Sequence, residues 1–382
     1  MEHLREAGLT AYRRGGSREA ATCFRRALDA HARLPRTDDW KRAAIDLRFD
    51  FRHAVVPIAE MADLGDLLGE CERFATELHD RPRLARTWAF LGHHHWWFGG
   101  HERAADYCRR ALGVASAQGD RALQISTTMY LGLAFLAQGA YRAAERLFRA
   151  LVGSEGSGLT RERFGVAIVG VSSRAYLAMV LAEIGDLAEG AAVADDAVRL
   201  AEPMRHPFAL AHAYVGAASV ALAADDHDRA IRLFEWYQAE LARMGAGEAW
   251  PLADWYAGLA YVRAGRVERG LALLEPIRDP ARAVTGGLSR SLVGAWVAEA
   301  HLAAGHPVEA LTFAESARAL AHEHGERGYE AAALLVLADV TARRDLAAAS
   351  EHYTAARKIA AELGMRPLAA RCARAEAALV GP

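Results

Sequence analysis

The chain has 382 residues, of which 52% are hydrophobic and 25% are charged, and its formal net charge is −2 at pH 7. That hydrophobic content excludes an intrinsically disordered chain, and the near-zero charge gives no electrostatic basis for nucleic acid or an anionic membrane as the main partner. No apolar run approaches the roughly 18 to 20 residues of a membrane span, and the first ten residues lack the apolar core of a secretory signal. Four scattered cysteines without paired spacing are typical of a reducing compartment, so the sequence predicts a cytoplasmic protein.

A repeat runs the length of the chain, and its most regular feature is a turn residue that ends a helix. A small residue follows five positions later in each repeat except the second, where Glu70 takes its place. Successive turns lie 34 to 50 residues apart, a spacing typical of helical-repeat proteins. The turn positions are Gly15, Gly65, Gly99, Gly139, Gly185, Asp225, Gly265, Gly305 and Arg343.

Each repeat is predicted to form two amphipathic helices that pack against each other. In the third repeat, Trp88, Leu91 and Gly92 begin the pattern W-x2-L-G. Ala104 and Cys108 continue the pattern on the second helix. This spacing resembles the tetratricopeptide repeat, in which small residues occupy the positions where two helices cross most closely. Glycine ends a helix because it adopts the left-handed backbone without strain, and second helices are expected to end at Gly119, Gly245, Gly325 and Gly364.

These features predict an all-α protein, a right-handed tetratricopeptide-type solenoid of about nine helix pairs. The second repeat has the weakest pattern, with Pro57 inside its first helix. Residues 368–380 are expected to form an unpaired helix that caps the C-terminal end. No segment alternates with period two over a useful length, so no sheet is expected. The whole chain, residues 1–382, is predicted to form a single superhelix.

Five segments between the repeat cores carry a narrower resemblance. Together they resemble the C-terminal repeat region of large bacterial signalling regulators, which have an adenylate-cyclase-like domain and a P-loop ATPase domain before the repeats. The resemblance covers nearly the whole chain, but the sequence contains neither G-x-x-x-x-G-K-[S/T] nor the metal-binding aspartates of a cyclase. Those activities therefore do not carry over, and the chain is either such a repeat region or a stand-alone relative. The segments are Ala44–Pro57, Arg161–Gly165, Arg205–Phe208, Glu326–Glu330 and Glu362–Leu368.

In proteins of this kind, the first helices of the repeats line a concave groove, and the side chains expected there are unusually apolar and rich in rings. Such a surface is typical of a binding site; the alternative is simple packing across the groove, and both interpretations are open. The predicted ligand- or partner-binding residues are Arg86, His93, Trp96, Trp97, Met129, Leu133, Leu136, Met179, Val215, Trp255, Leu259 and Glu299. Further positions on the same face are Ser126, Glu183, His212, Leu222, Val262, Arg263, Leu292 and Leu302.

Three consecutive histidines, His93, His94 and His95, raise the question of a metal site. On a helix their side chains point about 100° apart, so they cannot converge on one ion. Only His93 is expected to face the groove, beside Trp96 and Trp97. A cation or ring-stacking contact there is more plausible than a metal site, but the stretch is interpreted first as scaffold with one groove-facing aromatic patch. The sequence therefore predicts no metal site, no cofactor and no catalytic residues.

The sequence favours a non-enzymatic scaffold or sensor of bacterial signalling or transcriptional control. Its groove would bind a peptide, a partner helix or a small apolar effector, with Arg86 and Glu299 setting the polarity. One alternative is an enzyme or biosynthetic accessory protein that uses the groove as a reaction chamber, with His93, Glu299 and Tyr12 as acid–base groups. A second is an oligomerisation arm of a larger ATPase. Neither nucleic acid nor a membrane is expected as a partner, and the oligomeric state is left open.

Overall fold

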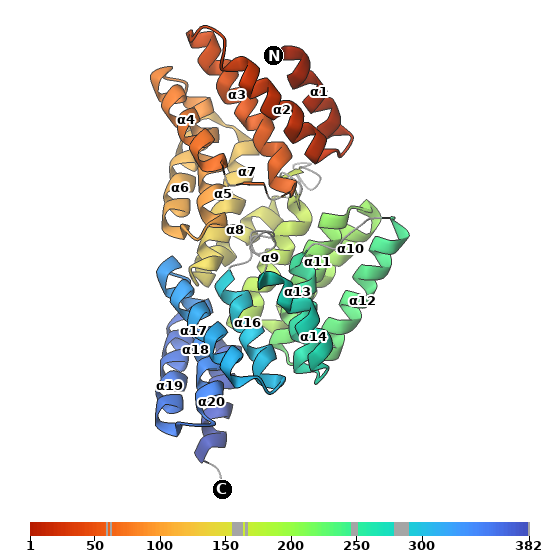
Figure 1. Cartoon of the computed structure of the whole chain (residues 1–382), viewed down its shortest axis with the longest axis vertical. Coiled ribbons are helices and arrows are strands. Elements are labelled where there is room, and N and C mark those ends of the chain that lie inside the picture. Colours follow the sequence, from red (N-terminus) through yellow and green to blue (C-terminus); the bar gives the residue numbers. More distant parts are fainter. Residues whose placement is uncertain are drawn as a thin grey trace. The chain divides into compact units, whose positions relative to one another are not determined.

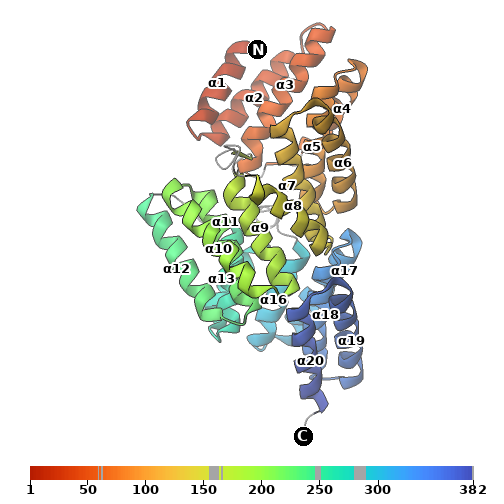
Figure 2. The same cartoon turned by 180° about the vertical axis from the view of Figure 1, so that it is seen from behind.

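The computed structural model describes residues 1–58, 60–61, 63–154, 163–164, 167–245, 251–278 and 290–380. Within these ranges the chain forms nine successive helix pairs and one further helix, shown from opposite sides in Figures 1 and 2. The first four pairs are α1 (Glu2–Arg13) with α2 (Ser17–His31), α3 (Asp38–Val55) with α4 (Leu64–Glu77), α5 (Arg81–Trp97) with α6 (His101–Gln118), and α7 (Arg121–Ala137) with α8 (Tyr141–Gly153). The next five are α9 (Val169–Ile184) with α10 (Leu187–Ala201), α11 (Pro207–Ala223) with α12 (His227–Arg243), α13 (Pro251–Arg263) with α14 (Val267–Leu274), α16 (Arg290–Ala303) with α17 (Pro307–His324), and α18 (Arg327–Thr341) with α19 (Leu346–Leu363).

The predicted all-α helical-repeat fold is confirmed, and the last helix, α20 (Arg366–Val380), is the expected C-terminal cap. Short 3₁₀ segments, η1 (Val56–Ile58), η4 (Glu202–Met204) and η5 (Glu275–Arg278), extend three of the helices. The expectation of no sheet was wrong in one place, because β1 (Arg163–Phe164) and β2 (Ala167–Ile168) pair as a two-stranded sheet between α8 and α9. None of the described helices combines the length and the apolar character needed to cross a bilayer.

The turns between helices show why glycine recurs. A left-handed backbone is found at six of the expected turn glycines and also at Asp225, whose φ is 58°. The four glycines expected to end second helices have it as well. Gly65 differs: it lies inside α4, where an added Cβ would come 2.7 Å from Nε2 of His94, so it allows a close approach between neighbouring helices. Arg343 lies in the turn between α18 and α19 without a positive φ.

Small residues sit where paired helices cross, as the repeat pattern predicts. A Cβ added at Gly92 would come 2.5 Å from Sγ of Cys108, and one added at Gly270 would come 2.6 Å from the carbonyl oxygen of Gly258. These distances are too short for a side chain, so the pairs depend on glycine at the crossing points. In the second pair, α3 ends at Val55, immediately before η1, because the ring of Pro57 cannot continue the helix.

The chain divides into two compact units. Unit 1 comprises Met1–Leu131 with Phe164–Val166, and unit 2 comprises Gly132–Arg163 with Ala167–Pro382, so the boundary falls inside α7. The core of unit 1 includes the fully or nearly fully buried side chains of Phe24, Ile45 and Leu68. In unit 2, α9 is apolar and buried almost all round, as expected for a helix with neighbours on every side. The single superhelix over residues 1–382 stays a prediction.

Candidate functional site

The predicted binding residues of unit 1 form a cluster of rings that is largely buried. The ring centroid of His93 lies 5.6 Å from that of Trp96, 5.7 Å from that of Trp97 and 4.5 Å from that of Tyr130. Met129 is fully buried, whereas Arg86, the remaining predicted residue of this unit, is exposed. The rings are therefore brought together, but mainly as packing within the unit.

The buried guanidinium of Arg52 lies among these rings and contacts three of them. The Nη2 atom of Arg52, a residue that is 2% exposed, donates to the hydroxyl of Tyr130 at 2.7 Å and lies 3.3 Å from Nδ1 of His93. The guanidinium also lies over the ring of Phe90, with its carbon 4.0 Å from the ring centroid. Burial and then the charge of Arg52 lower the pKa of His93 well below its usual range, so this imidazole is neutral.

The three consecutive histidines point in different directions, as predicted. His94 contacts Phe98, with ring centroids 4.7 Å apart, and His95 stacks on Tyr107 at 5.4 Å with nearly parallel planes. His95 thus takes the aromatic packing position of the repeat. Across the described ranges, no group of three or more histidine, cysteine, aspartate or glutamate side chains could hold a metal ion.

In unit 2 the predicted binding residues separate into two groups. The first consists of five side chains that are at most 6% exposed and pack within the helix layer: Leu133, Leu136, Met179, Val215 and Trp255. The second consists of Leu259 and Glu299, which line a cavity. Of the further positions on the predicted face, Glu183, Leu222, Arg263 and Leu292 also line it.

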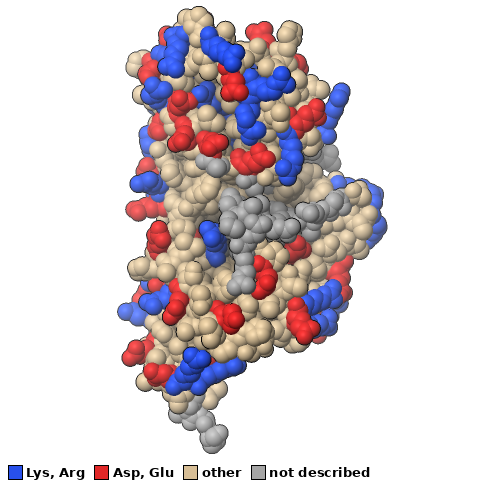
Figure 3. All heavy atoms as spheres, in the orientation of Figure 1, with Lys and Arg blue, Asp and Glu red and all other residues tan. Residues whose placement is uncertain are grey.

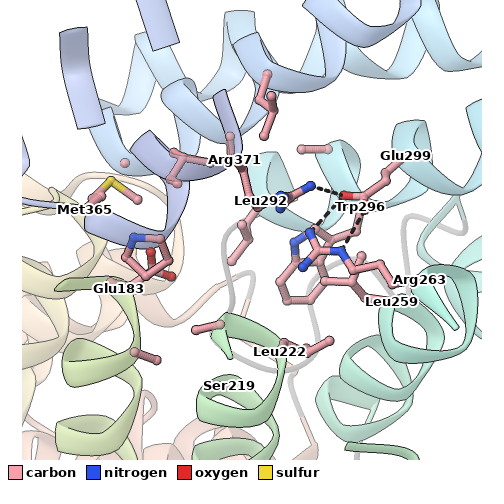
Figure 4. A pocket seen from close by; sticks show the side chains of 18 of the residues that line it. Glu183, Ser219, Leu222, Leu259, Arg263, Leu292, Trp296, Glu299, Met365 and Arg371 are labelled. Carbon is pink, nitrogen blue, oxygen red and sulfur yellow. Dashed lines mark hydrogen bonds and ion pairs between the residues drawn. The ribbon is translucent and has the colours of Figure 1, made fainter. Parts of the chain in front are cut away.

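This cavity has a volume of about 170 Å³ and lies among the first helices of five successive pairs, α9, α11, α13, α16 and α18, with α20 across them. Figure 4 shows labelled side chains of α9, α11, α13, α16 and α20 around a common space. Much of the lining is apolar, including Leu259, Trp296 and Met365. The cavity is thus a ring-lined space with a few charged groups, the usual composition of a ligand pocket.

One end of the cavity holds a charged group of three side chains (Figure 4). Glu299 accepts from both Nε and Nη2 of Arg263, at 2.7 and 2.9 Å, and lies 3.6 Å from Nη2 of Arg371. Burial alone would raise the pKa of Glu299, but the two arginines outweigh it and hold the pKa at about 2. The carboxylate is therefore charged at neutral pH and is already shared between two cations.

Glu183 projects into the cavity apart from that group. Its carboxylate has no hydrogen bond or ion pair with any residue in the described ranges, and Figure 4 draws no interaction to it. Burial raises its pKa to about 7, an effect that the charge of Arg263 only partly opposes. Glu183 therefore changes its charge near neutral pH.

One wall of the cavity is formed by a helix that is distant in sequence from the others. Arg366, at the start of α20, pairs with Asp186, which follows α9. Arg374, further along α20, lies 3.3 Å from Asp225 in the turn after α11. These contacts join segments 180 and 149 residues apart and place Arg371 between them, against Glu299.

Sequence reasoning missed Trp296 and Arg371. A signal for Trp296 was available, because it precedes Glu299 by three residues and so shares its helix face. For Arg371 no signal was available, since repeat geometry says nothing about where a capping helix folds.

On the molecular face drawn in Figure 3, acidic and basic side chains are interspersed among the described residues without a large region of one sign.

Solved structures with the same fold were found by comparison. A Rap protein complexed with Competence and Sporulation Factor has 12% identity and a TM-score of 0.68, covering 95% of this chain and 98% of that chain. The Rap conjugation gene regulator of plasmid pLS20, in complex with the Phr* peptide, has 11% identity and a TM-score of 0.57, covering 94% and 95%. The apo quorum sensor NprR from B. thuringiensis has 11% identity and a TM-score of 0.54, covering 94% and 98%.

At these identities the likeness shows a shared helical-repeat fold. No family model matches the sequence, and no curated protein is significantly similar to it.

Proposed function

We propose that this protein is a non-enzymatic, peptide- or protein-binding regulator of bacterial signalling, acting in the cytoplasm. Its ligand would dock on the first-helix face of unit 2, with one side chain entering the cavity. The observation that carries the proposal is a cavity lined by the first helices of five successive repeats and by α20. Two of the similar structures were solved with a peptide or factor bound, which supports the same kind of ligand here.

The chemistry of the cavity supports a ligand that is mostly apolar. Trp296 and Leu259 present ring and alkyl surface, while most of the charged side chains of the lining are paired with each other. Large apolar and aromatic side chains are the usual anchors in protein recognition. Because each repeat contacts mainly its neighbours, a ligand held by several first helices would change the rotation between repeats, and these small changes add up.

The test is a variant that fills the cavity without removing core atoms. Ser219 lines the cavity, and its hydroxyl donates to the carbonyl oxygen of Val215, four residues earlier. Ser219→Leu should fill the space. The matched control is Thr312→Leu, because Thr312 lies exposed on α17 and makes the same type of hydrogen bond to Val308.

Peptides selected from a random display library against the wild-type protein would be titrated by calorimetry against both variants. We expect Ser219→Leu to weaken binding at least tenfold and Thr312→Leu to leave it unchanged, with thermal denaturation confirming that both variants fold. Equal binding by wild type and a folded Ser219→Leu variant would rule out the cavity as the docking site.

A catalytic role is the second candidate, because the carboxyl of Glu183 has a pKa of about 7, as a general base requires. The sequence analysis considered His93, Glu299 and Tyr12 as acid–base residues of one reaction chamber. The structure adds no support for this set, because Tyr12 and His93 belong to unit 1 and Glu299, in unit 2, is bound by two arginines.

A further inference from the structure

The cavity of unit 2 contains one acidic side chain that the described residues leave unneutralised. We infer that Glu183 binds an ammonium group whose alkyl stem lies against the rings of the cavity. This inference rests on the proposed function, since it names the ligand chemistry of the same cavity. The shared chemistry is a primary alkylammonium, supplied either by a lysine side chain of a bound peptide or by a free amine.

Two features around Glu183 favour a cation. The residue lies in the last turn of α9, and Leu222 and Ala223, at the end of α11, line the same cavity. The carbonyl ends of helices carry partial negative charge and stabilise positive groups. Trp296 and Tyr256, two further lining residues, pack edge to face with ring centroids 4.9 Å apart and supply aromatic surface for the alkyl stem of such a cation.

The other charges of the cavity make an anionic ligand unfavourable. The Nε and Nη2 atoms of Arg263 both donate to the carboxylate of Glu299, and Arg371 lies against the same carboxylate. An anion would have to compete with this internal carboxylate, whereas a cation at Glu183 displaces nothing in the described structure.

The cavity volume sets the length of the alkyl stem. A cavity of about 150 Å³ holds a ligand the size of benzene, so the volume of about 170 Å³ found here admits a stem of about four to six carbons. A lysine side chain falls within that range. The carboxylate must be ionised to bind the ammonium, and burial has raised its pKa to about 7. The other titratable groups that interact with Glu183 are Arg263 and the hydroxyls of Tyr141, Tyr256 and Tyr329, and the pKa of each is raised from its usual value, which is already far above 7. Binding should therefore strengthen as the pH rises through 7.

The test compares a charged and a neutral probe of equal size. n-Pentylamine, 1-pentanol and N-acetyl-lysine-N-methylamide would be titrated by ligand-observed NMR into the wild-type protein, Glu183→Gln and the control Glu351→Gln. Glu351 is a suitable control because it is exposed on α19, outside the cavity lining. Replacing a charge-assisted hydrogen bond by a neutral one should weaken amine binding about 10- to 100-fold in Glu183→Gln.

We expect wild type to bind n-pentylamine about tenfold more tightly at pH 8 than at pH 6, following the ionised fraction of Glu183, with no such dependence in Glu183→Gln. Binding of the lysine derivative would assign the ammonium to a peptide, and binding of pentylamine alone would assign it to a free amine. The inference is overturned if 1-pentanol binds as tightly as pentylamine, if Glu183→Gln retains amine binding, or if neither amine binds wild type at pH 8. Peptide binding that remains sensitive to Ser219→Leu would then still support the proposed function.

Discussion

Replacing Glu183 with glutamine should stabilise the protein at pH 8 and leave its stability nearly unchanged at pH 4. The pKa of this carboxyl rises from 4.5 in an unfolded chain to about 7 in the folded state, because burial penalises its charge. At about 1.36 kcal/mol per pH unit, ionised Glu183 destabilises the folded state by about 3 kcal/mol above pH 7. Glutamine stays neutral and removes that penalty.

The direction with pH follows from proton binding. Between pH 4.5 and about 7 the folded state holds a proton on Glu183 that the unfolded state has lost, so wild-type stability falls as the pH rises through this window. The free energy of unfolding would be measured by urea denaturation at pH 4, 6 and 8 for wild type, Glu183→Gln and Glu351→Gln. A difference between wild type and Glu183→Gln that is the same at pH 4 and pH 8 would refute the reasoning, because it would show that Glu183 ionises freely in the folded protein.

Three other substitutions test the packing and the charges, and the addition of Zn²⁺ tests the histidines. Glu299→Gln leaves Arg263 without its carboxylate and should destabilise the protein by about 3 kcal/mol at pH 7; because the folded pKa of Glu299 is about 2, thermal denaturation should show about half that loss at pH 3. Gly270→Ala should destabilise by about 1 to 3 kcal/mol because its Cβ meets backbone at 2.6 Å. Gly113→Ala, with nothing within 4 Å of the new Cβ, should stabilise by about 0.5 to 1 kcal/mol in the same denaturation assay. Zn²⁺ should leave the melting temperature unchanged because His93 faces rings, and a rise of several degrees would contradict this.

Local features predicted from sequence were the most accurate. Glycines at the turns and at the helix crossings were recognisable from sequence. The turn glycines adopt a left-handed backbone, and the crossing glycines leave no room for a Cβ, and both requirements depend only on nearby residues. Helix capping is equally local: Oδ1 of Asp80 and Oδ1 of Asp120 each accept from the backbone amide three residues ahead. Gly65 shows the limit, because its role depends on His94 in the next pair and not on a turn of its own.

The candidate site was predicted only in part. Leu259 and Glu299 line the cavity, whereas Trp255, on the same helix as Leu259, is buried in packing. Helical periodicity places a side chain on a face, but it cannot say whether that face meets another helix or an open space. The same helical spacing therefore predicted both Trp255, which packs against other helices, and Glu299, which faces the cavity.

The sequence by itself determined the all-α helical-repeat fold, most of its turns and its small crossing residues, because helix capping and helix–helix contact act over a few residues to one repeat. Only the tertiary structure decided where a cavity remains, because α20 returns to α9 through Arg366 and Asp186, 180 residues apart. This contact places Arg371 beside Glu299, whereas Glu183 has no partner in the described structure. The charge balance of the cavity thus arises from contacts between distant repeats, which no pattern confined to one repeat encodes.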